Sequence, residues 1–361
     1  MRWTRQLVDD VTGSWLNLLL LAAPASWWLS LAGGSSLWVF VLAAVALIPA
    51  AGLIGRATEE LASRSGPTLG GFLNATFGNA AELIIAIVAL RAGHVEVVKA
   101  SITGSLLGNV LLVFGGACLV GGLKHGQQRF NRTSAGSVAI MLVLAVVALV
   151  MPAIVDLVAF GSLGAHPPTI DRLSEWTAVI LLTVYVAGLI FAFRTNKDPF
   201  RGAHAGGRAN QTGALTLLGA ATVLTAIQAE LLVGALEPAL DHFGMTELFA
   251  GVIVIALVGN AAEHYSALTA AAANDMTLAL EISVGSSAQI ALMVAPVLVL
   301  ISPLFGRPMS LVFNAFEITA IALSVGTAAL VAFDGESNWL EGLQLLGVYL
   351  ILAAAFYVIP G

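Results

Sequence analysis

The sequence predicts an all-α integral membrane protein with eleven transmembrane helices. Of its 361 residues, 58% are hydrophobic and only 10% are charged, against about 25% charged in a typical soluble domain. The apolar residues form eleven runs, each close to the roughly 20 residues that a spanning helix needs. Two of these runs carry the same motif, Gly-Asn-Ala-Ala-Glu, at residues 78–82 and 259–263.

Short polar or Gly- and Pro-bearing links separate the runs. The predicted spans lie near residues 14–33, 36–54, 70–91, 98–121, 134–154, 175–193, 213–236, 247–272, 277–301, 309–332 and 339–359. The first run is alternatively a signal peptide, because Arg2 and Arg5 precede it. However, Asp9 and Asp10 stand where such a peptide has its positive flank, so we expect a helix.

Lys and Arg lie almost entirely in the links, and their distribution predicts the orientation. Eleven of them fall on the side of the N-terminus, and four fall on the other side: Arg91, Lys99, Arg172 and Arg307. The N-terminus is therefore expected in the cytoplasm and the C-terminus outside. Twelve Arg against three Lys in an Ala- and Gly-rich chain favour a prokaryotic plasma membrane. The net charge of -6, without a basic patch, excludes nucleic-acid binding.

The two motif copies belong to a longer internal repeat. Residues 70–113 and 251–294, compared at a constant offset of 181, are identical at fourteen of forty-four positions, including Gly104-Ser105 against Gly285-Ser286. The copies occupy spans three and eight, an odd number of spans apart, so they cross the membrane in opposite directions. The predicted parts are an N-terminal extra helix (1–35), a first five-helix repeat (36–194), a cytosolic linker (195–212) and a second, inverted five-helix repeat (213–361).

Each motif places an acid at membrane depth, where a charged side chain costs about 2.5 to 3.5 kcal/mol and therefore indicates an ion pathway. Asn and Glu three residues apart share a helix face. The preceding glycine lets the backbone unwind and expose carbonyl oxygens. The predicted cation- and proton-binding groups are two carboxylates, two amides and two backbone donors: Glu82 and Glu263, Asn79 and Asn260, Gly78 and Gly259. The amides are alternatively clamps between helices.

An all-oxygen site with two carboxylates suits Ca²⁺, which takes 6 to 8 oxygen ligands, better than Mg²⁺. Two facing carboxylates in a low-dielectric cavity cannot both stay ionised without a cation, so protons compete with the metal. If the empty dianion is too costly to reorient, the fluxes of Ca²⁺ and H⁺ become coupled. The motif therefore predicts a cation/proton antiporter.

Several polar residues near the motifs are weaker candidates. Those expected to support the site are Ser105, Ser286, Gln289 and His264. His264 is either a proton relay or a structural histidine. Glu60 and Glu230, in similar sequence contexts of spans two and seven, are candidates for an access path. Glu317, in span ten, is an acid without a repeat partner and receives no predicted role.

At these residues the chain resembles the Ca²⁺/H⁺ exchanger (CAX) family of the cation/Ca²⁺ exchanger superfamily. The matching stretches are residues 57–61, 74–83, 259–264 and 283–290. The resemblance implies one extra helix followed by two inverted five-helix halves, and alternating access in which Glu82 and Glu263 bind cation or protons in turn. One departure is the linker, which is basic here, whereas many relatives carry an acidic helix at that point.

Other functions remain open at this point. The alternatives are a Na⁺/Ca²⁺ exchanger, a proton-coupled antiporter of Mn²⁺, Na⁺ or K⁺, and, from a different class, a passive cation channel. Opposed copies argue against a channel, whose units usually repeat about an axis normal to the membrane. The chain has no nucleophile with a paired base, so we expect no enzyme. Its partners are expected to be the bilayer and the transported Ca²⁺ and H⁺, without a cofactor, and the single cysteine, Cys118, excludes a disulfide framework.

Overall fold

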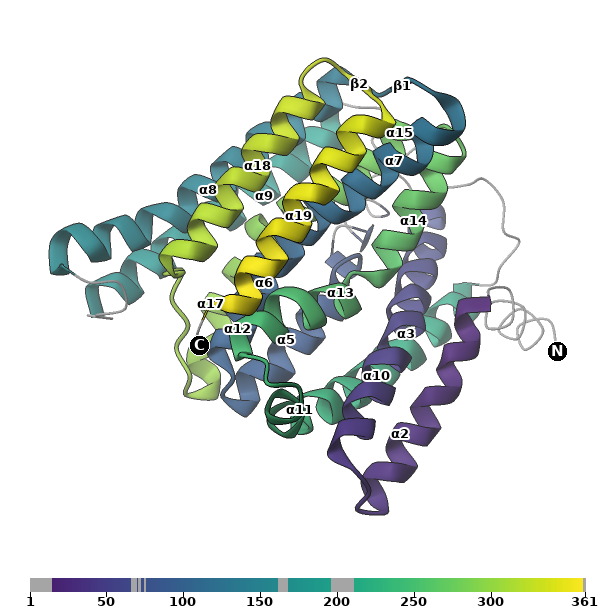
Figure 1. Cartoon of the computed structure of the whole chain (residues 1–361), viewed down its shortest axis with the longest axis vertical. Helices are drawn as coiled ribbons and strands as arrows, with labels where there is room; N and C mark the ends of the chain where they lie inside the picture. The colour runs from purple at the N-terminus through teal and green to yellow at the C-terminus, as the bar shows by residue number, and fades with distance from the viewer. Residues whose placement is uncertain are drawn as a thin grey trace. The chain divides into compact units, whose positions relative to one another are not determined.

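The computed structural model describes residues 15–65, 70, 73–74, 76–161, 168–195 and 211–359. Within these ranges the chain is helical almost throughout (Figure 1), and the strands β1 (Gln128–Arg129) and β2 (Glu336–Ser337) form one short antiparallel pair. The all-α class is therefore confirmed. The predicted linker, 195–212, lies mostly outside the described residues.

Eight helices in the described ranges are long and apolar enough to cross a membrane, and each overlaps a predicted span. They are α3 (Ser36–Arg64), the run from α6 through α7 (Val95–His125), α8 (Arg132–Phe160), α9 (Pro168–Thr195), α10 (Gln211–Gly234), the run from α15 through η6 (Met276–Phe305), α18 (Ala315–Ala332) and α19 (Trp339–Val358).

The other three predicted spans are not continuous long helices. Run 14–33 forms η1 (Trp15–Leu21) and α2 (Ala22–Leu31), which together are shorter than a usual span. Runs 70–91 and 247–272 are interrupted inside the repeated motif. Their second halves are α5 (Ala80–Ala92) and α14 (Ala261–Ala272), and the latter follows α12 (Glu247–Phe249), η3 (Ala250–Ile255) and α13 (Ala256–Gly259). In the described residues, three of the eleven predicted spans are therefore short or interrupted.

Helix α18 begins at Ala315 rather than near residue 309. Asn314 Oδ1 accepts a hydrogen bond from Glu317 N (2.8 Å), and Glu317 Oε2 accepts one from Asn314 N (3.1 Å). This reciprocal capping box sets the N-terminus of α18, with Asn314 as the N-cap residue. The stretch Met309–Phe313 before it is buried but has no regular secondary structure, so hydropathy alone places the helix start too early.

The chain divides into two compact units, and each unit draws on both predicted halves. The first unit contains residues Met1–Ala92, Val186–Met245 and Val258–Ala262. The second contains Gly93–Tyr185, Thr246–Leu257 and Glu263–Gly361.

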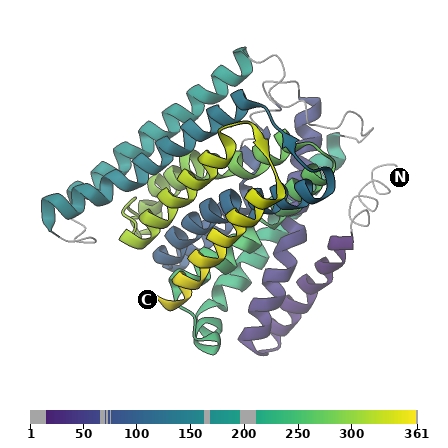
Figure 2. The same cartoon turned by 45° about the horizontal axis from the view of Figure 1, so that its top comes forward.

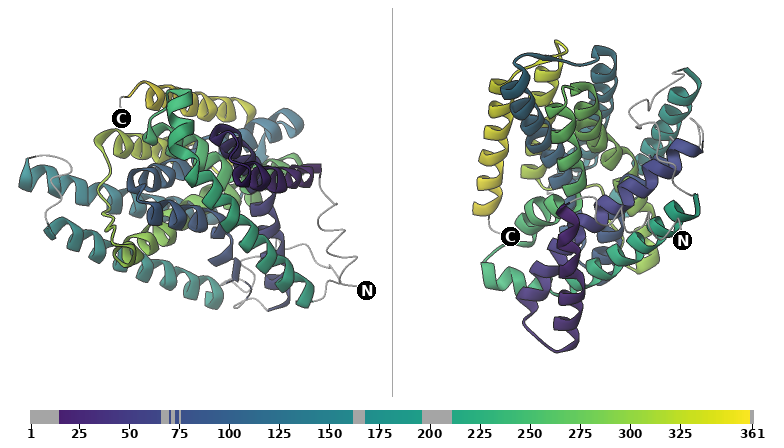
Figure 3. Two further views of the ribbon diagram at one scale, coloured as in Figure 1. Left: turned by 90° about the horizontal axis from the view of Figure 1, so that it is seen from below. Right: turned by 90° about the vertical axis from the view of Figure 1, so that its right-hand side faces the viewer.

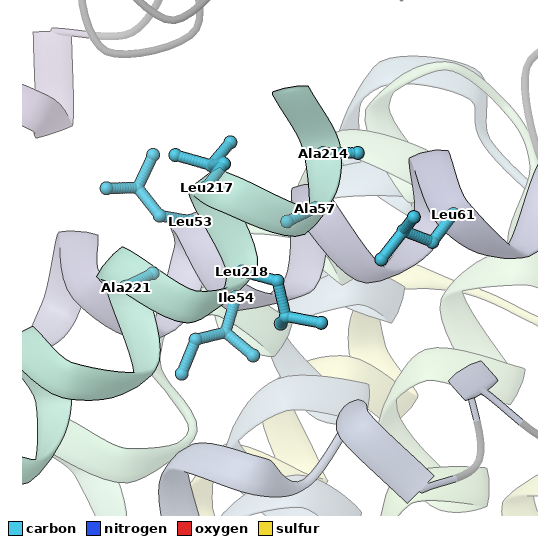
Figure 4. Packing of buried hydrophobic residues seen from close by; sticks show 8 residues of the cluster. All are labelled: Leu53, Ile54, Ala57, Leu61, Ala214, Leu217, Leu218 and Ala221. Atoms are coloured by element: carbon cyan, nitrogen blue, oxygen red, sulfur yellow. The ribbon is translucent and has the colours of Figure 1, made fainter. Parts of the chain in front are cut away.

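In the first unit, α10 packs along α3, and α2 folds back beside α3 (Figure 3). Leucine, isoleucine and small alanine side chains alternate along this contact (Figure 4). The cluster is Leu53, Ile54, Ala57, Leu61, Ala214, Leu217, Leu218 and Ala221. Because lipid tails are as apolar as leucine, such a contact stabilises the unit in a bilayer by van der Waals packing and not by removal from water.

In the second unit, α6 (Val95–Leu107) packs on η3, α7 (Phe114–His125) on α19, and α8 on α18; Figure 2 shows α19 running beside α7. Glycines bring these backbones together. A Cβ built at Gly104 would overlap the carbonyl oxygen of Val252, and one at Gly251 would overlap the Cβ of Ala100. Small residues permit such close approach of membrane helices.

The second unit also contains π-helical turns, which occur frequently at functional sites. In the described ranges they are η2 (Gly108–Val113), η3, η4 (Glu281–Gly285) and η5 (Ile290–Val294). The single α-helical turn α16 (Ser286–Gln289) lies between η4 and η5, and α17 (Ala295–Ile301) and η6 (Ser302–Phe305) follow. Two of the residues predicted to support the site therefore lie between two widened turns of one helix.

Gly104→Ala should destabilise the second unit, because its methyl group would push α6 away from η3. Overpacking of this kind costs about 1 to 3 kcal/mol. The repeat provides a matched control, since a Cβ at the equivalent Gly285 meets no atom within 4 Å. Thermal unfolding in detergent should show a lower midpoint for Gly104→Ala than for Gly285→Ala. Equal midpoints would contradict this account of the contact.

Candidate functional site

The first motif interrupts its helix at Gly78 and Asn79, which lie in a turn. Gly78 N donates to Asn74 O (2.8 Å) and closes the first half-helix, and Leu83 N donates to Asn79 O (3.1 Å) and opens α5. A Cβ at Gly78 would lie 2.6 Å from Asn74 O, so the turn requires glycine. Glu82 therefore lies in the first turn of α5.

The second motif has the same construction. α13 ends at Gly259, Asn260 interrupts the helix, and α14 begins at Ala261, which is 181 residues after the first residue of α5. Glu263 lies in the first turn of α14, as Glu82 does in α5. The predicted unwinding beside each motif glycine is thus confirmed, whereas the role of the glycine carbonyls as ligands remains a prediction.

A helix interrupted in this way brings complementary charges together. The carbonyl end of the first half-helix carries partial negative charge, and the first N–H groups of the second half carry partial positive charge. A carboxylate in the first turn of the second half is stabilised by that positive charge, and the carbonyl end of the first half attracts a cation. Each interruption therefore combines a tolerated acid with oxygen donors.

Three of the four polar side chains of the motifs are buried. Asn79 and Asn260 expose 2% and 1% of their surface, and Glu82 exposes 9%. Within the first unit, the second motif passes directly beside the acid of the first: a Cβ built at Gly259 would lie 3.5 Å from Glu82 Cγ and 4.0 Å from Glu82 Oε1. Glycine at position 259 therefore leaves space next to the Glu82 carboxylate.

Glu263 and its neighbour His264 are half-buried residues with fully buried polar atoms. Among the described residues, neither Glu263 Oε2 nor His264 Nε2 has a hydrogen-bond partner. A buried polar atom without a partner costs about 1 to 3 kcal/mol, and such atoms in native proteins call for a functional explanation. The Glu263 carboxylate thus has an oxygen suited to a proton or a cation.

Comparison with known proteins identifies the family. The model of the family described as sodium/calcium exchanger protein matches residues 35–194 and 213–358, most of the chain. The chain belongs to this exchanger family. Among its relatives, a protein of Aphanothece halophytica named Ca²⁺/H⁺ antiporter is 43% identical over 340 residues, which cover 89% of this chain and 90% of the relative.

Solved structures agree with this assignment of the exchanger chain. The structure of native YfkE superposes with a TM-score of 0.83 at 40% identity, covering 95% of this chain and 100% of that one. The crystal structure of an H⁺/Ca²⁺ exchanger, CAX, gives a TM-score of 0.72 over 99% of this chain and 93% of that one; at 17% identity this likeness concerns the fold alone. The predicted family resemblance is confirmed.

The residues predicted to support the site have different environments in this exchanger chain. Ser105 on α6 and Ser286 on α16 are buried, at 5% and 8% exposure. Gln289, at the end of α16, is half-buried. Their contribution to ion binding remains a prediction.

The two candidates for an access path also differ. Glu60, near the end of α3, is half-buried. Glu230, on α10, forms an ion pair with Arg91 of α5, and 48% of its side chain is exposed. Glu230 is thus less buried within the protein than its position in an apolar run suggests, and its charge is paired with that of Arg91. The access-path role remains a prediction for both.

Glu317 has no repeat partner in the sequence, and the structure shows what this acid contacts. In addition to capping α18, Glu317 accepts a hydrogen bond at Oε1 from Thr103 Oγ1 of α6 (2.9 Å), and both side chains are buried. This acid therefore ties the start of α18 to α6. The pattern Asn-x-x-Glu before an apolar run was the available signal for the cap, whereas the Thr103 contact spans 214 residues.

Glu317→Leu should lower the stability of the protein, because it leaves the Thr103 hydroxyl and the Asn314 amide without acceptors. Loss of a buried partner costs about 1 to 3 kcal/mol per group.

The Thr103 bond can be tested separately with Thr103→Val, Glu317→Gln and the double variant. Thermal unfolding should show that the loss of stability in the double variant is smaller than the sum of the two single losses. Strictly additive effects would mean that the Thr103 bond contributes nothing. Glu341→Gln, in the half-buried capping box of α19, is the control.

Proposed function

We propose that this chain exchanges Ca²⁺ for H⁺ across the membrane by alternating access, with Glu82 and Glu263 binding the cation or protons in turn. The observation that carries the proposal is the pair of matched helix interruptions, each with an acid in the first turn that follows. The position of Gly259 against Glu82 further supports it. Identity of 43% to a protein named Ca²⁺/H⁺ antiporter favours these two ions over other pairs.

The donor set fits a doubly charged hard cation. Two carboxylates match the charge of Ca²⁺ and supply up to four of its 6 to 8 oxygen ligands. Among the described residues, no three His, Cys, Asp or Glu side chains gather in one place. The other ligands in the proposal are therefore the amides of Asn79 and Asn260, free carbonyls near Gly78 and Gly259, and water.

Coupling follows from the cost of an empty site. With neither metal nor protons, the two carboxylates would face a low-dielectric interior as bare anions, so reorientation of the empty site is disfavoured. Occupation by Ca²⁺ or by protons removes this cost. Exchange of one ion for the other then follows from electrostatics, without a chemical step, as expected of a transporter and not of an enzyme.

Three pairs of structural features separated by about 181 residues support the inverted repeat. The first is the pair of motif interruptions. The second is the turn that follows each acid-bearing half-helix, in which Gly93 and Asn274 both have positive φ, at 98° and 66°. The third is the pair of π-helical segments η2 and η5. The two stretches that match the family model, 35–194 and 213–358, nearly coincide with the two predicted five-helix halves.

Contacts between links support eleven crossings with the N-terminus in the cytoplasm and the C-terminus outside. Links on the same side of the membrane can touch, whereas links on opposite sides cannot. Among the described residues, six polar contacts join links or span ends of the same predicted side: Asn17 with Arg56, Arg91 with Glu230, His94 with Glu247, Lys124 with Ala272, Gln127 with Glu336, and Ser174 with Leu311. The prokaryote-like composition favours the plasma membrane.

Glu82→Gln and Glu263→Gln should each abolish Ca²⁺ uptake driven by a pH gradient in proteoliposomes. Each amide keeps the size of the side chain but loses the charge that binds Ca²⁺ and the proton that it exchanges. Full uptake by either variant would remove that residue from the mechanism. Glu341→Gln is a matched control, since Glu341 also lies in the first turn of a helix, α19, but belongs to neither motif.

The same vesicles separate the alternatives. A Na⁺ gradient in place of the pH gradient should drive no Ca²⁺ uptake; uptake under these conditions would favour a Na⁺/Ca²⁺ exchanger. If Mn²⁺, Na⁺ or K⁺ inhibits Ca²⁺ uptake by competition, that cation is an alternative transported ion. A passive channel would release preloaded Ca²⁺ without any gradient of the second ion.

Gly259→Val should weaken Ca²⁺ binding by crowding the Glu82 carboxylate. The valine methyl groups would extend beyond the Cβ position that already lies 3.5 Å from Glu82 Cγ. Gly259→Ala, whose Cβ makes ordinary van der Waals contact, is the control. We expect a KM for Ca²⁺ about tenfold higher for valine than for alanine, a change equivalent to about 1.4 kcal/mol. Equal KM values would show that this space does not serve the ion.

A further inference from the structure

The half-helix that carries Glu263 must be held in place at the end remote from the acid. The interruption at Asn260 separates α14 from α13, so α14 is not a continuation of the preceding helix, and contacts at its other end contribute to its position. At its other end, α14 ends in a tight turn. Asn274 is left-handed there, with φ of 66°, and Asp275 N donates back to Ala270 O (2.9 Å), as in a Schellman motif.

Side chains from the last turn of α7 and from β1 hold this end of α14. Gln128 is buried, at 2% exposure, and its Nε2 donates to Ala271 O (3.2 Å) and to Asn274 Oδ1 (2.8 Å). Lys124 Nζ donates to Ala272 O (2.7 Å), and His125 Nε2 lies 2.9 Å from the same oxygen. The last carbonyls of a helix have no helical partner, and positive groups there interact favourably with the helix dipole.

Helix α7 is shaped to admit this contact. A Cβ built at Gly121 would overlap the amide of Gln128, so only glycine leaves room for that side chain. Five residues earlier, a Cβ at Gly116 would lie 3.1 Å from Leu268 Cδ2 of α14. The glycines of α7 therefore accept both the side of α14 and the group that caps its end.

We propose that Gln128 and Asn274 form a clamp that sets the position of α14 along its axis, and thereby the position of the Glu263 carboxylate. The proposal rests on the proposed function, in which Glu263 binds the transported ion. Eight residues separate Glu263 from Ala271, about 12 Å of helix at 1.5 Å per residue. Because an α-helix is stiff over that length, a shift at its C-terminal end moves the acid by a similar amount. Gln128 is thus a positioning residue.

The other repeat lacks this clamp. Position 93, equivalent to 274, is glycine and has no side-chain acceptor, and the guanidinium of Arg307 covers it, with Cζ 3.4 Å from a Cβ built there. The polar clamp is thus specific to the half-helix of Glu263. The two acids of the repeat are therefore positioned by different means.

Gln128→Met keeps the length of the side chain and removes both donors. It should raise the KM for Ca²⁺ about fivefold, the effect of roughly 1 kcal/mol for one net hydrogen bond, and leave the maximal rate within about twofold. Gly121→Ala, which displaces the Gln128 amide through its methyl group, should reproduce the effect. Asn274→Gly keeps the left-handed turn but loses the acceptor, and should also raise the KM for Ca²⁺. Asn274→Asp keeps the acceptor and should have the KM of the wild type.

Arg129→Met is the control. Arg129 lies next to Gln128, but its charge pairs with Glu336 of β2 and not with α14. Unchanged KM in Gln128→Met, Gly121→Ala and Asn274→Gly, with wild-type exchange measured in parallel, would overturn the clamp and leave the proposed function intact. Amide hydrogen exchange tests the clamp without transport: residues 263–272 should exchange faster in Gln128→Met than in Arg129→Met. Equal exchange would overturn the clamp, even if the wild type proved to move no Ca²⁺.

Discussion

The rest of the structure depends on the interruption of two membrane helices, because hydrocarbon cannot satisfy free backbone groups. Irregular backbone at membrane depth is tolerated only where protein or a water-filled cavity surrounds it. The chain places its interruptions at Gly78-Asn79 and at Asn260, where the asparagines are almost completely buried. The backbone groups that each interruption frees, together with the acid of the following turn, form the proposed ion-binding apparatus.

The close packing of glycines follows from the same constraint. Membrane helices gain no hydrophobic energy by association, so van der Waals contact and hydrogen bonds must hold them together. Gly104 allows the backbone of α6 to touch that of η3, which leads into the second motif, and Gly121 admits the buried amide of Gln128. Polar groups such as Glu317 and Gln128 then connect helices at their ends, where unpaired backbone groups are available.

Two identical motifs do not have identical surroundings. Glu82 has the glycine of the other motif beside it, whereas Glu263 lies on a half-helix whose far end is held by Gln128 and Asn274. A duplicated element can diverge in this way because the motif determines only the local backbone. Contacts with the rest of the chain determine how firmly each copy is held.

The sequence by itself determined the membrane class, the position of most spans, the paired motifs and the family, because hydropathy and short-range residue patterns are local properties. It also determined that the helix would unwind beside the motif glycines. Only the tertiary structure decided that Glu317 binds Thr103, that Glu230 pairs with Arg91, and that Gln128 reaches the end of α14. These contacts join residues more than a hundred positions apart, and no periodicity in the sequence records which distant helices will lie side by side.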